Sequence, residues 1–127
     1  MIFNWRHFLS LAVRMLRSHT PSETEIRTAV GRAYYAAYLE CCDLAKSRGL
    51  KFSGSKPSHE QVWQFFRSGG SATRPWGQAA SKHVGDIGVA LRAMRTQADY
   101  YLAPPTSTAD AQRAVAMSQE ILRRLPA

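Results

Sequence analysis

Residues 28–45 read TAVGRAYYAAYLECCDLA, and their apolar side chains recur every three or four positions, the spacing of an α-helix face. With one residue just upstream, the first apolar face consists of Ile26, Val30, Ala33, Ala37, Cys41 and Leu44. A second apolar face consists of Tyr35, Tyr38, Leu39 and Cys42. A helix that is apolar on two sides lies between neighbours, and Gly31 with the alanines lets those neighbours approach. The segment therefore predicts the central helix of a bundle.

Local signals place the ends of this central helix at Pro21 and Arg48. Thr20 suits the N-cap, Pro21 suits the first helical position, and Glu23 completes a capping box with Thr20. Gly49 follows the last predicted turn, and glycine commonly ends helices.

Four further helical segments surround the central one, and no strand alternation is present. They span residues 2–18, 59–68, 78–102 and 107–125. The apolar stripe of the longest of these consists of Val84, Ile87, Leu91, Ala98 and Leu102. Ser58 is suited to cap the short third helix, and Ser107 with Asp110 to start the last.

Two segments rich in glycine and serine, residues 49–58 and 69–77, read as loops. We therefore expect an all-α fold in which residues 1–127 form one domain. The expected architecture is an up-and-down bundle of four long helices and one short helix.

The chain carries 17 Lys and Arg side chains against 9 Asp and Glu, a formal net charge of +8. Most of the basic residues are arginines, whose planar donors match phosphate oxygens. This balance favours an anionic partner, most commonly nucleic acid. The alternative is charge kept for solubility, which composition alone leaves open.

Cysteine usage and the first residues bear on the compartment. Cys41 and Cys42 are adjacent, so an intrachain disulfide between them is disfavoured and a reducing cytoplasm is expected. Arg6, Arg14 and Arg17 interrupt the apolar stretch at the start of the chain. An amphipathic helix is expected there, neither a signal peptide nor a membrane span.

Residues 91–102, LRAMRTQADYYL, place charged side chains beside the apolar stripe of their helix. Arg92, Arg95 and Asp99 share one edge of this helix, Tyr100 points nearly the other way, and Tyr101 flanks the far side of the stripe. We expect a half-buried Arg95 with Asp99 as its partner. One interpretation is an ion pair at a helix edge. The other is a pair of arginines that hold a phosphate, oriented by Asp99 or a tyrosine.

Three segments together resemble the HEPN family of small α-helical domains, which are often dimers. They are RTAVGRAYYAAYLECCDLAKSRG at 27–49, SHEQVWQFF at 58–66 and LRAMRTQADYYL at 91–102. The family has an SRAYYAAF-like run on one helix, matched by residues 31–38, and R-x-x-A-D-Y-like endings on a later one, matched by 95–100. The resemblance extends from about Glu25 to the last residue.

The resemblance implies an RNA-directed function. Active HEPN domains are metal-independent ribonucleases of toxin–antitoxin, CRISPR and phage-defence systems, often found beside a small nucleotidyltransferase. It implies Arg95, Asp99 and Tyr100 as catalytic positions and Arg92, Arg95 and Arg32 as RNA-binding positions. The arginine would neutralise the scissile phosphate while a histidine moves protons. No metal or other cofactor is implied, and no histidine pair here has metal-ligand spacing.

The chain departs from the family's catalytic signature, an arginine followed after four to six residues by histidine. From Arg95 the matching positions are Tyr100, Tyr101 and Leu102. Tyrosine ordinarily ionises near pH 10 and is a poor base at neutral pH. An arginine–histidine match elsewhere, Arg14 with His19, lies on the wrong helix for the family.

Three interpretations therefore stay open. The chain is an RNA-binding or RNA-cleaving module, or it is a non-catalytic adaptor that pairs with itself or with a protein such as a nucleotidyltransferase. The third interpretation follows from the resemblance alone, because some toxin-like members of the family carry a nucleotidylated tyrosine close after the arginine motif, and it makes Tyr100 or Tyr101 the site of nucleotidylation. The sequence also leaves open whether His59 or His83 reaches Arg95 from another helix.

Overall fold

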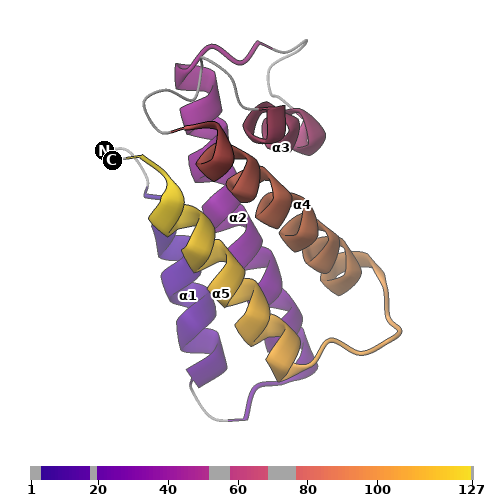
Figure 1. Cartoon of the computed structure of the whole chain (residues 1–127). Helices are drawn as coiled ribbons and strands as arrows, with labels where there is room; N and C mark the ends of the chain where they lie inside the picture. The colour runs from indigo at the N-terminus through magenta and orange to yellow at the C-terminus, as the bar shows by residue number, and fades with distance from the viewer. Residues whose placement is uncertain (1–3, 18–19, 52–57, 69–76, 127) are drawn as a thin grey trace.

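The computed structural model describes residues 4–17, 20–51, 58–68 and 77–126, which contain five α-helices and no strand (Figure 1). The helices are α1 (Arg6–Arg17), α2 (Glu23–Ser47), α3 (His59–Ser68), α4 (Gln78–Tyr100) and α5 (Thr108–Arg124). The all-α prediction is confirmed for these residues. The predicted loops fall largely outside the described residues, as do both ends of the first predicted helix and His19 of the Arg14 match.

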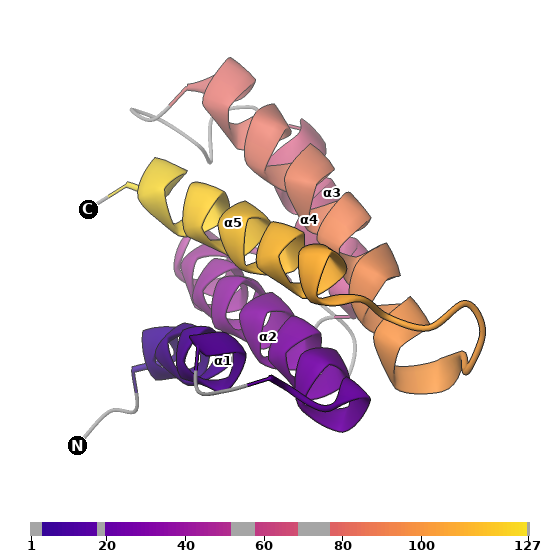
Figure 2. The ribbon, with the colours of Figure 1, turned by 90° about the horizontal axis from the view of Figure 1, so that it is seen from below.

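Helix α2 is central, as its two apolar faces predict. It packs against each of the other four helices, and Figure 2 shows α1, α5 and α4 grouped around it. Side chains of both predicted faces are buried, among them Val30, Cys41, Tyr38 and Cys42. Tyr34 is fully buried as well, although neither predicted face includes it. The hydrophobic core draws on all five helices.

The start of α2 corrects the predicted N-cap. Ser22, not Thr20, occupies the cap, and its side chain accepts a hydrogen bond from the Glu25 backbone N–H at 3.1 Å. Glu25 in turn accepts from the Ser22 N–H at 3.0 Å. The pattern of a small hydroxyl residue followed three positions later by glutamate occurs twice here, and the sequence alone favoured the wrong one. The predicted caps at Ser58 and Ser107 are both present, and in each the third residue of the helix completes a capping box.

Glycines of α4, not of α2, provide the closest helix contact. A Cβ on Gly88 would lie 2.2 Å from the Trp63 ring of α3, and one on Gly85 would lie 2.8 Å from the Arg67 backbone nitrogen. At Gly31 of α2 the nearest atom, the Asp99 Oδ1, would be 3.7 Å away, an ordinary contact. The close approach expected at Gly31 is therefore found at the α3–α4 contact.

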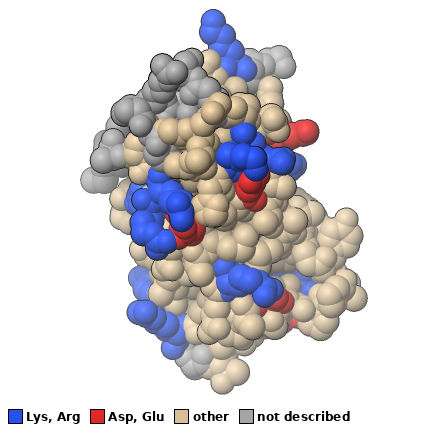
Figure 3. Space-filling model, viewed as in Figure 1, with Lys and Arg blue, Asp and Glu red and all other residues tan. Residues whose placement is uncertain are grey.

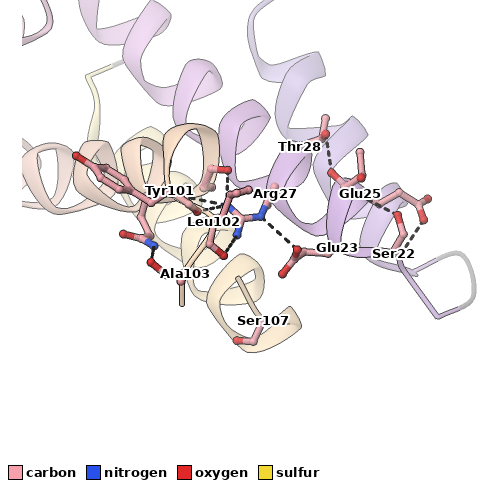
Figure 4. A network of polar contacts seen from close by, with 12 residues as sticks. Ser22, Glu23, Glu25, Arg27, Thr28, Tyr101, Leu102, Ala103 and Ser107 are labelled. Carbon is pink, nitrogen blue, oxygen red and sulfur yellow. Dashed lines mark hydrogen bonds and ion pairs between the residues drawn. The ribbon is translucent and has the colours of Figure 1, made fainter. Parts of the chain in front are cut away.

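Helix α4 ends at Tyr100, before the predicted Leu102. The Arg27 guanidinium of α2 donates to the carbonyl oxygens of Ala98 at 2.8 Å and Tyr101 at 2.7 Å (Figure 4). It also donates to the Leu102 carbonyl at 3.2 Å. Leu102 lies beyond the helix and is 89% exposed, so its predicted place in the buried stripe is wrong.

Candidate functional site

Arg95 is partly buried and paired as the sequence predicts. Its side chain is 16% exposed, and its Nε lies 2.8 Å from the Asp99 Oδ2, four residues later on α4. The guanidinium also lies over the Tyr35 ring of α2, 5.2 Å from the ring centroid. The Nε–H has no hydrogen-bond acceptor among the described residues. The short Nε–Oδ2 contact is therefore an ion pair that lacks hydrogen-bond geometry, and the Nε atom itself is buried.

Tyr100 lies against Arg95, which corrects its predicted orientation. The Arg95 guanidinium is 5.4 Å from the Tyr100 ring centroid, while the tyrosine is 67% exposed. The arginine thus touches one aromatic ring from α2 and one from its own helix. Tyr101 is exposed beyond the end of α4 and contributes its carbonyl oxygen to the contact with Arg27.

Two exposed arginines flank this pair. Arg32 of α2 lines a hollow of about 250 Å³ together with Tyr35 and Asp99. Arg92 of α4 lines another hollow of about 250 Å³ with Trp63 and Glu60 of α3. Arg32 therefore lies near Arg95, because both are close to Tyr35 and Asp99, whereas Arg92 lines a separate hollow against α3.

His59 reaches this region from α3. It is the first residue of that helix, and the capping box of Ser58 and Gln61 fixes where the helix begins. Its ring stacks on Tyr38, with centroids 4.1 Å apart and planes 5° apart. Burial, and then the positive charges of Arg92 and Arg95, lower the pKa of His59 to about 4. The imidazole is therefore neutral at pH 7, beside two arginines.

The other histidine left open by the sequence lies elsewhere. His83 has its Nε2 3.8 Å from the Glu120 carboxylate of α5. Glu120 also pairs with Arg123 and Arg124 of its own helix. Figure 3 shows Lys and Arg in several separate groups on one face, some beside acidic side chains. On this face the basic side chains are thus dispersed and do not form one patch.

Two consecutive hydrogen bonds involve the Nδ1 side of the His59 ring. The Trp63 Nε1–H donates to the Tyr34 hydroxyl oxygen at 3.1 Å, and this oxygen lies 2.6 Å from the His59 Nδ1. Burial raises the pKa of Tyr34 well above its ordinary value, and that of Tyr38 to about 12. Both hydroxyls therefore stay protonated at neutral pH.

We call Arg32, Tyr35, His59, Arg92 and Arg95 the arginine–aromatic cluster. The sequence predicted its arginines from one helix edge and one motif. It left the histidine open and missed the Tyr34 and Trp63 side chains behind it, because these come from α2 and α3 and meet only in the folded chain. The tyrosine-rich run on α2 was the available signal, but periodicity does not say which ring faces α3.

Comparisons with known proteins found no match. No family model, curated protein or solved structure matches the chain. The described residues contain no group of three or more His, Cys, Asp or Glu side chains placed to hold a metal ion. In the same part of the chain, every helix is too short or too polar to cross a membrane.

Proposed function

We propose that the chain binds RNA through the arginine–aromatic cluster. The observation that carries this proposal is the position of Arg95, whose guanidinium lies over the Tyr35 ring of α2 and also against the Tyr100 ring of its own helix. Exposed cations that follow a groove, together with aromatic rings on which bases stack, are the features that bind single-stranded nucleic acid. Arg32 and Arg92 extend the positive charge on either side.

The wider proposal is a HEPN-like, RNA-associated module. Its supports are the resemblance of residues 31–38 and 95–100 to the family's motifs and their places on α2 and α4. On this proposal, residues 1–127 form one up-and-down four-helix domain with an added short helix. The domain acts as a homodimer in the cytoplasm, within a toxin–antitoxin or antiviral defence system.

Within this proposal, binding is favoured over cleavage. Asp99 is engaged with Arg95, and the exposed Tyr100 replaces the base that the family's ribonucleases place after their arginine. If the chain does cleave RNA, Arg95, Asp99 and Tyr100 are the proposed catalytic residues and the reaction is metal-independent.

The test is binding and cleavage of a fluorescein-labelled single-stranded RNA in EDTA. Arg92→Gln removes one exposed charge from the cluster, and Arg14→Gln removes one from α1 as a matched control. We expect Arg92→Gln to weaken binding several-fold and to flatten its dependence on salt, because each phosphate contact releases counterions. Arg14→Gln should bind as the wild type does. Equal effects of the two variants would contradict the proposal.

The second candidate function is a protein adaptor, and the exposed end of α4 favours it. Tyr100, Tyr101 and Leu102 form a run of exposed apolar side chains there. Such a run suits a second copy of the chain or a protein partner such as a nucleotidyltransferase. Light scattering after gel filtration should show loss of self-association in a Tyr101→Ser, Leu102→Ser variant. An unchanged mass would count against self-association through this run.

The tyrosine hydroxyls at the same place are also the proposed modification sites. Both Tyr100 and Tyr101 are exposed, so a modifying enzyme can reach them. A nucleotide added there would bring negative charge beside Arg95. Mass spectrometry of protein co-expressed with its genomic neighbours should show a nucleotide adduct on one of them, and its absence would remove this proposal.

A further inference from the structure

We infer that His59 contacts the RNA as a neutral hydrogen-bond donor, whose Nε2–H shares one phosphate group with Arg92 and Arg95. This inference rests on the proposed function and assigns a ligand-binding role to a histidine outside the arginine motif. The Tyr34 hydroxyl and the Trp63 indole are positioning residues, which act on the ligand only through His59.

The first step is the direction of the hydrogen bonds behind His59. The indole nitrogen of Trp63 can only donate, so the Tyr34 oxygen is the acceptor in their 3.1 Å contact. Tyr34 is fully buried, so water does not reach its hydroxyl proton. Among the described residues the His59 Nδ1, 2.6 Å away, is the one acceptor within reach of that proton, so we assign the Tyr34 hydroxyl as the donor in this contact. The hydrogen bonds are therefore donated in the order Trp63 to Tyr34 to His59.

The second step is the tautomer. A neutral imidazole carries one N–H, so a ring whose Nδ1 accepts a hydrogen bond has its proton on Nε2. Nε2 lies on the ring edge away from the Tyr34 hydroxyl. Stacking of the ring on Tyr38, with planes 5° apart, holds the imidazole in this orientation. The Nε2–H is thereby a donor of fixed direction on a half-buried side chain.

The third step is the charge around this donor. The Tyr35 ring connects this donor to Arg95, because its centroid lies 6.1 Å from that of the His59 ring and 5.2 Å from the Arg95 guanidinium. Arg92 lines the hollow beside Trp63, and both arginines disfavour a positive charge on His59. The tyrosine hydroxyls that face the ring from α2 stay protonated, and the next residue on α3, Glu60, lines the hollow beside Arg92. Two cations beside a neutral N–H donor suit an anion with several acceptor oxygens, and a phosphate group has that form.

The tautomer also has a consequence for chemistry. A neutral imidazole with its proton on Nε2 has no lone pair there to accept the ribose 2′-hydroxyl proton, and it gives up its own proton very reluctantly. His59 therefore binds phosphate without acting as the acid or base of RNA cleavage. This distinguishes a binding site from a displaced version of a ribonuclease site.

The spectroscopic test begins with the wild type. A long-range ¹H–¹⁵N correlation spectrum of the wild type at neutral pH should show His59 with its proton on Nε2 and a bare Nδ1. In Tyr34→Phe the same spectrum should show a mixture of tautomers, which a merely structural hydroxyl would not produce. A proton on Nδ1 in the wild type would overturn the inference.

The binding test uses the labelled single-stranded RNA in EDTA and two substitutions of one residue. His59→Phe keeps the stacked ring and removes both nitrogens, and we expect it to weaken binding about tenfold. His59→Gln places an amide donor near the former Nε2 and should bind within a few-fold of the wild type. Melting curves confirm that both variants fold.

The outcomes separate this inference from the function on which it rests. If Arg92→Gln weakens binding and His59→Phe does not, the cluster binds RNA and His59 does not contact it. If neither variant weakens binding, the proposed function itself fails. RNA cleavage that His59→Phe abolishes would also overturn the inference, because it would require a proton-transferring imidazole.

Discussion

At the scale of single residues, the close contact between α3 and α4 depends on two glycines of α4. Gly85 and Gly88 let the Trp63 ring and the α3 backbone lie directly against α4. Trp63 is almost fully buried and also holds Tyr34, so its position affects His59. Small residues at these two positions are therefore a requirement of the candidate site as well as of the core.

Gly88→Ala should lower the free energy of unfolding by about 1–3 kcal/mol, because the added methyl group overlaps a rigid, buried ring. The same change at Gly31 meets only an ordinary contact and should raise stability by up to about 1 kcal/mol, since alanine is the better helix former. Urea denaturation measures both. Similar effects at the two positions would show that the α3–α4 contact is less close than described.

The lowered pKa of His59 predicts the direction of a pH effect. The pKa of this histidine is 6.5 in the unfolded chain and about 4 in the folded chain. The unfolded state therefore binds more protons between these values, so stability falls as the pH is lowered from 6.5 towards 4. Urea midpoints across this range should fall less in His59→Gln than in the wild type. Parallel curves would contradict the shift.

At the scale of helices, composition and periodicity predicted the existence of all five elements, but tertiary contacts decided where they end. The caps at Ser58 and Ser107 were predicted correctly because each is the one hydroxyl residue directly before its helix that also has a polar partner three residues on. At the start of α2 there are two overlapping candidate capping boxes, Thr20 with Glu23 and Ser22 with Glu25, and the sequence does not decide between them. At α4 the last turn ends where Arg27 of α2 meets its carbonyl groups, which no local pattern in α4 encodes.

The corrected cap of α2 can be tested by a matched pair. Ser22→Ala should lower the free energy of unfolding by about 1 kcal/mol, because it leaves the Glu25 N–H without its side-chain acceptor. Thr20→Ala should have little effect. Urea denaturation of the two variants decides between the predicted and the observed cap, and a larger effect at Thr20 would favour the former.

Arg27 makes a second prediction at this scale. Its side chain is only 14% exposed and donates to carbonyl groups at the end of α4. Arg27→Lys keeps the charge but loses the planar fork, so we expect a loss of about 2 kcal/mol and faster amide exchange at Tyr101. Arg113→Lys on α5, where the side chain is well exposed, is the control. Unchanged exchange in Arg27→Lys would argue against this cap.

At the scale of the whole molecule, the arginine–aromatic cluster forms where three helices meet. The sequence identified Arg92, Arg95 and Asp99 because they share one helix, and a motif identified Arg32. His59 and Trp63 lie on α3, far in the sequence from Tyr34 of α2, and helix periodicity carries no information about which helices meet. The part of the site that could be predicted is therefore the part within single helices.

The most direct test of the central claim is a ¹H–¹⁵N NMR titration of the protein with a short single-stranded RNA in EDTA. The account predicts that the largest shift changes occur at Arg32, Arg92, the Arg95 Nε–H and His59. Signals of Arg14 on α1 and Arg113 on α5 should change little. Changes concentrated on α1 and α5, or none at all, would contradict RNA binding at this cluster.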